Sequence, residues 1–221
     1  MTSTEVLIAI PVKPFGVAKR RLAPVLGPNQ RRRLGRAVAA HVIAVALDTG
    51  FPVAVVTGDD GVAAWAQQLG ASSIADPPTG GLNGAAAAAV AVARQRMAWW
   101  MILHADLPTL KPSDLHQALE AIPEHGVVLA PSHNGGTSLI AGHLDAYPFA
   151  YGPASFRRHL ARATGFDPRV LVRPGLAIDL DGPEDLAVVA RLPAGQWLAP
   201  LIGRRVVSGS GLDPSTSLTR P

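Results

Sequence analysis

Basic residues crowd the loop that follows the first apolar run of the chain. Residues 6–10 predict a buried strand, and the Pro- and Gly-containing loop behind it carries Lys13, Lys19, Arg20 and Arg21. In open α/β sheets, ligands bind just beyond the carboxyl ends of the strands. Four cations at such a point suit a polyphosphate, although a solvated basic turn would contain the same residues. Carboxylates elsewhere in the chain favour the phosphate site.

Two acidic segments could complete that site. Asp106 comes directly after the apolar run 99–104, and Asp179 and Asp181 alternate at the end of a run, 176–180, that we expect to be a strand. Alternation would place both of these side chains on one face, where like charges repel unless a cation lies between them. Mg²⁺ usually takes one or two carboxylates together with substrate phosphates. The three aspartates therefore predict a Mg²⁺ site.

Structural roles remain open for several of these side chains. Asp106 could only begin a turn, and Asp181 could only be the N-cap of the next helix. Asp185 lies in the first turn of that helix, where it would serve the helix dipole. His41 and His104 are interpreted as packing or surface residues, because neither has a second histidine at metal-binding spacing.

Strand and helix patterns alternate along the chain, which predicts an α/β fold. The expected strands are 6–10, 53–57, 73–75, 99–104, 127–130, 138–141 and 176–180. The expected helices are 28–47, 61–69, 83–97, with Asn83 as N-cap, 112–121, 154–163 and 183–191. We expect a single Rossmann-like domain over 1–202, with helices on both faces of a mostly parallel sheet whose second half is mixed in direction. The Ser-, Gly-, Thr- and Pro-rich segment 203–221 predicts a disordered tail.

The amino-acid composition argues against several classes of protein. The 221 residues are 48% hydrophobic, contain no cysteine and no apolar run long enough to span a membrane, and show no signal peptide. We therefore expect a cytoplasmic protein without disulfides or thiolate chemistry. The formal net charge is +4 and the pI about 10.1, but the basic residues are dispersed and accompany no nucleic-acid-binding motif. Small phosphorylated ligands explain the excess better than nucleic acid does.

Six short motifs occur in an order that is specific, although each alone is weak. They are Pro11-Val-Lys with Ala18-Lys-Arg-Arg-Leu22, Gly81-Leu-Asn83, His104-Ala-Asp-Leu-Pro108, Gly135-Gly-Thr137, Tyr151-Gly-Pro-Ala-Ser-Phe156 and Ile178-Asp-Leu-Asp181. With these motifs, the chain resembles, over about residues 6–192, the 2-phospho-L-lactate or phosphoenolpyruvate guanylyltransferases of coenzyme F(420) biosynthesis. That resemblance implies a nucleotide-diphospho-sugar transferase (GT-A-like) fold.

The resemblance also implies a Mg²⁺-dependent reaction. GMP would move from GTP to the phosphate of a small three-carbon acid, phosphoenolpyruvate or 2-phospho-L-lactate, with release of pyrophosphate. The implied site residues are Lys19 and Asp106 for catalysis; Lys13, Lys19, Arg21 and Asn83 for the nucleotide; Thr137, Gly152 and Ser155 for the acid; and Asp106, Asp179 and Asp181 for the metal. A homodimer is one assembly that the sequence leaves open.

The acid-binding residues also have simpler interpretations. Free N–H groups at the start of the helix 154–163 could bind a phosphate, but Ser155 could be only a helix cap, Thr137 a strand residue and Gly152 a turn glycine. The family's usual Gly-Thr-Gly-Thr-Asn run is here Asn134-Gly-Gly-Thr-Ser138, and its frequent phenylalanine is Tyr151. Both departures fall in the acid pocket.

Other functions remain as alternatives. 3-Phospho-D-glycerate could be the acceptor. A GT-A glycosyltransferase would not need the basic first loop, and a molybdopterin guanylyltransferase would have a glycine-rich one. An anion- or nucleic-acid-binding module would bind without turnover. No Gly-x-Gly-x-x-Gly follows a strand and no P-loop occurs, which argues against a dinucleotide oxidoreductase and a P-loop enzyme.

Overall fold

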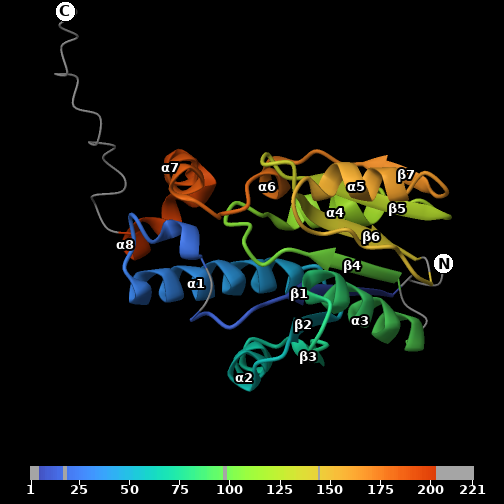
Figure 1. The fold of residues 1–221 in the computed structure, drawn as a ribbon, viewed down its shortest axis with the longest axis horizontal. Helices are drawn as coiled ribbons and strands as arrows, with labels where there is room; N and C mark the ends of the chain where they lie inside the picture. The colour runs from blue at the N-terminus through green and yellow to red at the C-terminus, as the bar shows by residue number, and fades with distance from the viewer. Residues whose placement is uncertain (1–4, 17–18, 97–98, 144, 203–221) are drawn as a thin grey trace, which may run out of the picture.

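The central sheet has seven strands in the order β3-β2-β1-β4-β6-β5-β7 (Figure 1). The strands are β1 (Val6–Pro11), β2 (Val53–Thr57), β3 (Ser72–Ala75), β4 (Trp99–Leu103), β5 (Gly126–Pro131), β6 (Thr137–Gly142) and β7 (Asp167–Val170). The structure is a computed structural model, and it describes residues 5–16, 19–96, 99–143 and 145–202. The α/β sheet and the mixed direction of its second half confirm the fold class expected from the sequence.

Strand direction explains how distant segments meet at one edge. β1 is parallel to β2 and β4, and β2 is parallel to β3, so these strands end on the same side of the sheet. β6 is antiparallel to both β4 and β5. Leu103 pairs with Leu139, and the amide of His104 donates to the carbonyl of Ser138 over 2.9 Å. The first residue of β6, Thr137, therefore lies beside the end of β4.

Helices cover both faces of the sheet. The described helices are α1 (Pro28–Leu47), α2 (Asp60–Gln68), α3 (Gly81–Gln95), α4 (Pro112–Glu120), α5 (Ser155–Arg162), α6 (Pro174–Ala177), α7 (Pro183–Arg191), α8 (Ala199–Ile202) and the 3-10 turns η1 (Arg20–Leu22) and η2 (Pro193–Leu198). Alternate residues of β1 enter different cores: Ile8 packs in the core that includes α1, α2 and α4, and Leu7 in the core that includes α3. Burial on both faces explains why β1 is continuously apolar.

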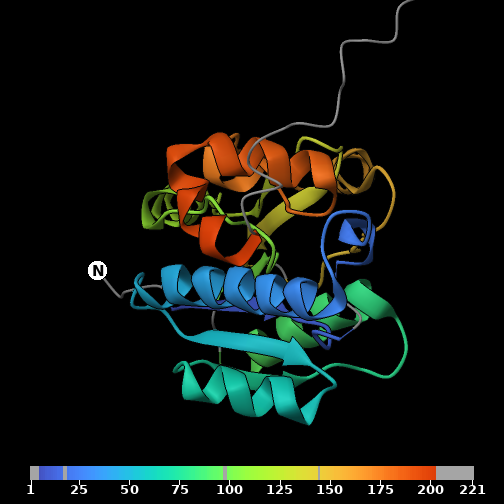
Figure 2. The ribbon, with the colours of Figure 1, turned by 90° about the vertical axis from the view of Figure 1, so that its left-hand side faces the viewer.

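A third core, away from the sheet, holds the C-terminal helices against the first half of α1 (Figure 2). Leu34 and Val38 of α1 pack there with Leu186 and Val189 of α7. Leu180 is also fully buried in this core. Because Leu180 stands between Asp179 and Asp181, its burial fixes the position of both acidic residues.

Two of the expected elements are wrong. The segment 176–180 is no strand: Pro174 begins the short helix α6, since its ring suits the first turn of a helix, and the chain after Ala177 is irregular. Asn83 is not an N-cap, because Gly80, at φ 98°, is the N-cap and α3 begins at Gly81.

One strand was missed, and one expectation concerns the end of the chain. β7 was missed because it is a four-residue, largely exposed edge strand without an apolar pattern. The tail expected over 203–221 lies outside the described residues. None of the described helices, the 20-residue α1 included, combines the length and the apolar character that crossing a bilayer requires.

Candidate functional site

A cleft with a volume of about 440 Å³ opens where β1 and β4 end. Its lining includes five of the residues singled out from the sequence, namely Lys13, Lys19, Asp106, Asp179 and Asp181. A concave site of a few hundred cubic ångströms is typical of small-molecule binding. The structure thus gathers the basic loop and both acidic segments around one space, as their positions after strands and before a helix suggested.

Lys19 forms the charged centre of this cleft. Its Nζ lies 2.9 Å from Asp106 Oδ2 and 3.5 Å from Asp181 Oδ1. Burial alone would lower the pKa of Lys19, but the two carboxylates raise it above the usual value. Lys19 also adopts a left-handed backbone conformation, φ 56°, which a non-glycine residue rarely does. Such strained positions are concentrated at functional sites, so Lys19 is held where it is by the surrounding structure.

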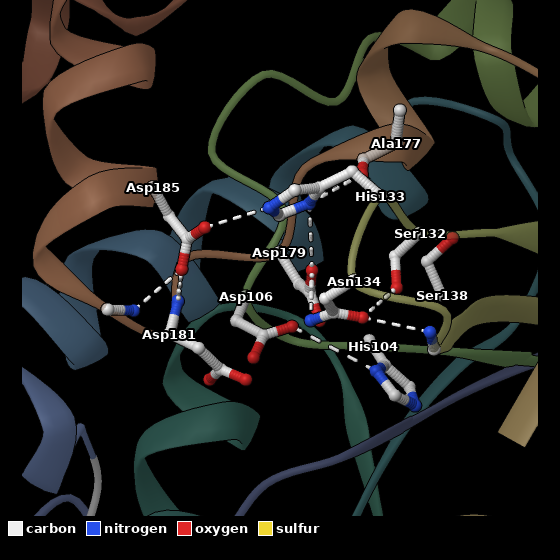
Figure 3. Close-up of polar contacts among 12 residues, drawn as sticks. His104, Asp106, Ser132, His133, Asn134, Ser138, Ala177, Asp179, Asp181 and Asp185 are labelled. Atoms are coloured by element: carbon white, nitrogen blue, oxygen red, sulfur yellow. Dashed lines mark hydrogen bonds and ion pairs between the residues drawn. The ribbon is translucent and has the colours of Figure 1, made fainter. Parts of the chain in front are cut away.

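Asp106 lies three residues after the buried end of β4. Burial would raise its pKa, but Lys19 and then His104 lower the pKa below the usual range, so the carboxylate is ionised. His104 Nδ1 lies 4.0 Å from Asp106 Oδ1 (Figure 3). In the described part of the chain, Asp106 Oδ1 is buried and has no hydrogen-bond partner. His104 lines the cleft, and its ring packs against that of Tyr151 at 5.3 Å between centroids.

Asp179 is held by an asparagine from another segment. The Nδ2 of Asn134 lies 3.0 Å and 2.8 Å from the two Asp179 carboxylate oxygens (Figure 3). Asn134 Oδ1 in turn accepts from the amide of Gly136, at 2.8 Å, and from the Ser132 hydroxyl, at 2.9 Å. Burial and the charge of Asp106 raise the pKa of Asp179. Asn134 was not among the predicted site residues, although its place in the turn before β6 is a signal that could have identified it.

Asp185 fixes the other side of the acidic segment. One of its oxygens accepts from the amides of Asp181, at 2.9 Å, and Gly182, at 2.6 Å, so the helix-terminus role expected for Asp185 is confirmed. Its other oxygen lies 2.9 Å from Nε2 of His133, whose Nδ1 is 3.6 Å from Asp179 (Figure 3). Gly182, not Asp181, is the N-cap of α7. The Asp181 side chain is therefore free of a capping role and faces Lys19.

The described residues contain no group of three or more acidic or histidine side chains arranged to hold a metal ion. The structure brings together two of the three predicted ligands, because Asp106 and Asp181 contact the same ammonium group. Asp179 contacts Asn134 instead. Two carboxylates that complete their cation with substrate phosphates match the usual Mg²⁺ pattern. The buried, unpartnered Asp106 Oδ1 is also an oxygen donor of the kind that Mg²⁺ prefers.

The residues implied for acid binding lie beside the cleft and are not part of its lining. Ser155 Oγ, at the start of α5, is 3.2 Å from Thr137 Oγ1, and both side chains are buried. Gly152 has φ 123°, a backbone conformation that residues with a side chain rarely adopt, so the position favours glycine. The amide of Phe156 donates to the carbonyl of Gly135 over 3.2 Å, which joins the start of α5 to the turn before β6.

Asn83 and Arg21, which the resemblance implies for nucleotide binding, do not line the cleft as Lys13 and Lys19 do. Asn83 lies in the first turn of α3, where its Oδ1 accepts from the amide of Tyr151 at 2.7 Å. It thus joins the helix behind Gly81 to the segment that carries Gly152. Arg21 lies exposed on η1 and is not among the cleft-lining residues.

Comparison with known proteins yields one family and several close relatives. The family model described as "Guanylyl transferase CofC like" matches residues 6–191. The phosphoenolpyruvate guanylyltransferase of Mycolicibacterium gilvum is 35% identical over 86% of this chain and 92% of its own length. Proteins of the same name are 37% identical in Thermomonospora curvata, over 94% of this chain and 93% of that protein, and 39% identical in Chloroflexus aggregans, over 81% and 94%.

Solved structures agree on the fold. A putative nucleotide-diphospho-sugar transferase from Desulfovibrio desulfuricans G20 matches with a TM-score of 0.72 at 18% identity, over 90% of this chain and 97% of that one. A nucleotidyl transferase from Methanothermobacter matches with a TM-score of 0.52 at 17% identity, over 82% and 94%. At these identities the likeness establishes the architecture alone.

Proposed function

Because the chain belongs to the CofC-like guanylyl transferase family, we propose that it transfers GMP from GTP to the phosphate of phosphoenolpyruvate. A phosphate oxygen of the acid attacks the α-phosphorus of GTP, the bond from that phosphorus to the β-phosphate oxygen breaks, and pyrophosphate leaves. The attacking oxygen is already ionised near neutral pH, so the reaction needs no general base. We further propose that the product serves coenzyme F(420) biosynthesis in the cytoplasm.

The observation that carries this proposal is the convergence of Lys19, Asp106 and Asp181 in one cleft at the strand ends. Phosphoryl transfer depends on positioning and on charge neutralisation more than on covalent chemistry. In the proposed complex, Lys19 and Lys13 contact the triphosphate, which runs over the first loop and the turn at Gly81. Lys19 is the catalytic cation because it lies closest to the carboxylates.

Mg²⁺ is the cofactor in this proposal. Asp106 and Asp181 would hold it, with nucleotide phosphates as further ligands, while Asp179 adds negative charge nearby and anchors Asn134. When bound, the ion would neutralise charge that develops on the transferred phosphate. With their charges balanced by such an ion, Asp106 and Asp181 would leave the Lys19 ammonium group available to the triphosphate.

The acid binds on the side of β6 and α5. Thr137 and Ser155 offer hydroxyl groups, and Gly152 allows a close approach of the backbone. Among acceptors, phosphoenolpyruvate is the first choice because several relatives carry that name. 2-Phospho-L-lactate differs from it only in lacking the double bond, and 3-phospho-D-glycerate has a C2 hydroxyl group and its phosphate on C3, so the three acids must be compared directly.

Pyrophosphate release tests the proposal. The purified chain is incubated with Mg²⁺ and GTP and one of the three acids, with ATP in place of GTP and chelator in place of Mg²⁺ as controls. Release that requires GTP, Mg²⁺ and phosphoenolpyruvate is the expected result. Release with only one of the other two acids would identify that acid as the acceptor in place of phosphoenolpyruvate. No release with any acid from folded protein would overturn the proposal and favour an anion-binding module.

A further inference from the structure

A buried histidine that the proposed reaction does not use lies behind the two hydroxyl groups of the acid site. His159, on α5, is fully buried. Its Nε2 is 2.7 Å from the amide nitrogen of Ala150, and its Nδ1 is 3.0 Å from Thr137 Oγ1. Thr137 Oγ1 is in turn 3.2 Å from Ser155 Oγ. Four groups from three segments therefore form one continuous hydrogen-bonded chain.

The direction of this chain follows from its first member. A backbone amide can only donate, so Nε2 of His159 must accept from Ala150. A neutral imidazole carries a single N–H, which must then be on Nδ1, and this N–H donates to Thr137 Oγ1. The Ala150 amide thereby selects the tautomer of His159, and His159 supplies a proton to the hydroxyl pair instead of taking one.

The direction of these hydrogen bonds leaves one of the two hydroxyl protons of Thr137 and Ser155 available to a ligand. Thr137 and Ser155 have two hydroxyl protons, and one of them is used in the hydrogen bond between the two oxygens. Because His159 donates, the other proton stays available to an outside acceptor, whichever hydroxyl carries it. With the opposite tautomer, Nδ1 would accept the spare proton, and the hydroxyl pair would offer a ligand only lone pairs.

We infer that Ala150, His159, Thr137 and Ser155 form a directional relay that presents one hydroxyl proton to an anionic oxygen of the acid substrate. His159 is a positioning residue in this relay, because it acts through Thr137. The inference rests on the proposed function for the identity of the ligand, but not for the direction of the hydrogen bonds.

The surroundings of His159 keep it neutral and fixed. Burial, followed by the charges of Arg158, Arg162 and His104, lowers its pKa to about 4. The Tyr147 hydroxyl donates to the His159 carbonyl over 2.7 Å, and the Tyr151 ring packs edge-on at 4.7 Å between centroids. The positive charges around the ring thus disfavour the imidazolium form.

Nitrogen NMR of the ligand-free protein tests the direction of the relay without any assay of activity. The chain has seven histidines, and the ring signals of His159 are assigned in the wild-type protein by through-bond correlation to its backbone resonances. We expect a protonated Nδ1 and an unprotonated Nε2 that stay unchanged from about pH 5.5 to 8. A protonated Nε2 in this range would overturn the inference.

Two substitutions of His159 test how the relay affects KM for the acid substrate. Asn at position 159 places an amide near Nδ1 and can still donate to Thr137, whereas Gln reaches only the Nε2 position and can still accept from Ala150. We expect His159→Gln to raise KM for the acid about tenfold and His159→Asn to raise it about threefold or less, with KM for GTP unchanged in both. Equal acid KM values, the reverse order, or equal effects on the two substrates would overturn the relay.

The NMR and kinetic results distinguish failure of the relay from failure of the proposed function. If the wild-type chain transfers GMP to no acid, the proposed function fails while the NMR experiment still decides the relay. If neither variant folds, the NMR of the wild-type protein decides it. If transfer occurs but Nε2 is protonated, the relay fails and the proposed function stands.

Discussion

The amide of Leu180 donates to the carbonyl oxygen of Asp106 over 2.9 Å, which joins the two acidic segments backbone to backbone. This bond and the burial of Leu180 leave the Asp106 and Asp181 carboxylates little freedom to separate. The site can therefore lose one charge without losing its geometry, which makes isosteric substitutions informative.

Asp106→Asn is expected to reduce kcat about 10³-fold, because it removes one charge from the cation site while keeping the size of the side chain. Circular dichroism and a thermal melt check the fold. Asp145→Asn, at an exposed position paired with Arg94, is the control and should act like wild type. Wild-type turnover by folded Asp106→Asn would show that this carboxylate is not catalytic.

Lys19→Met is expected to lower kcat/KM for GTP about 10²-fold, since the triphosphate loses its nearest cation. Lys19→Arg should recover only part of the loss, because a planar guanidinium cannot fill the place of a compact ammonium between two carboxylates. Steady-state kinetics at varied GTP measure both. Lys111→Met, on an exposed residue before α4, is the matched control; an equal loss there would refute a specific role for Lys19.

Asn134→Asp should destabilise the turn before β6 and raise KM for the acid. The carboxylate could still accept from Gly136, but it could not donate to Asp179 and would repel it. The loss of a partly buried hydrogen bond to a charged group costs about 2 kcal/mol, enough to lower Tm by several degrees. Calorimetry measures Tm, with exposed Asn29→Asp as the control. An unchanged Tm would mean that the Asn134–Asp179 contact contributes little.

His159 should make stability depend on pH below neutrality. The folded pKa of about 4 lies below the usual 6.5, so unfolded chains bind a proton that the folded protein does not. Stability is complete above about pH 6.5 and is lost as pH falls toward 4, by roughly 3 kcal/mol in total. Urea titrations of wild type and His159→Gln isolate this contribution as the difference between their slopes with pH. Parallel curves would contradict a neutral buried His159.

The parts of the fold that sequence predicted well are those with a strong local signal. β1 and β2 are continuous apolar runs, and α1 has a proline at its first position, so these elements were found within a residue of their bounds. β7 carries no such signal because it is an exposed edge strand, held by pairing with β5. The segment before Asp179 was wrongly predicted to be a strand, because an apolar run of that length is equally compatible with a strand and with a short helix.

The charged part of the site was predictable and its supporting contacts were not. Lys19 lies in the loop after β1 and Asp106 in the loop after β4, and parallel strands bring such loops to one edge. Asn134, His133 and His159 owe their roles to β6 running antiparallel and to α5 packing behind it. The contacts of Asn134 with Asp179, of His133 with Asp185 and of His159 with Thr137 join residues 22 to 52 positions apart, and no spacing rule within the sequence identifies them.

The double contact of Lys19 has a consequence for how the protein is handled. An internal counter-ion balances Asp106 and Asp181, so folding should not depend on a divalent ion. Chelator should leave the melting temperature of the free protein nearly unchanged. GTP and Mg²⁺ should raise it together far more than the sum of their separate effects, because the ion can displace the lysine only when a triphosphate offers that lysine a new partner.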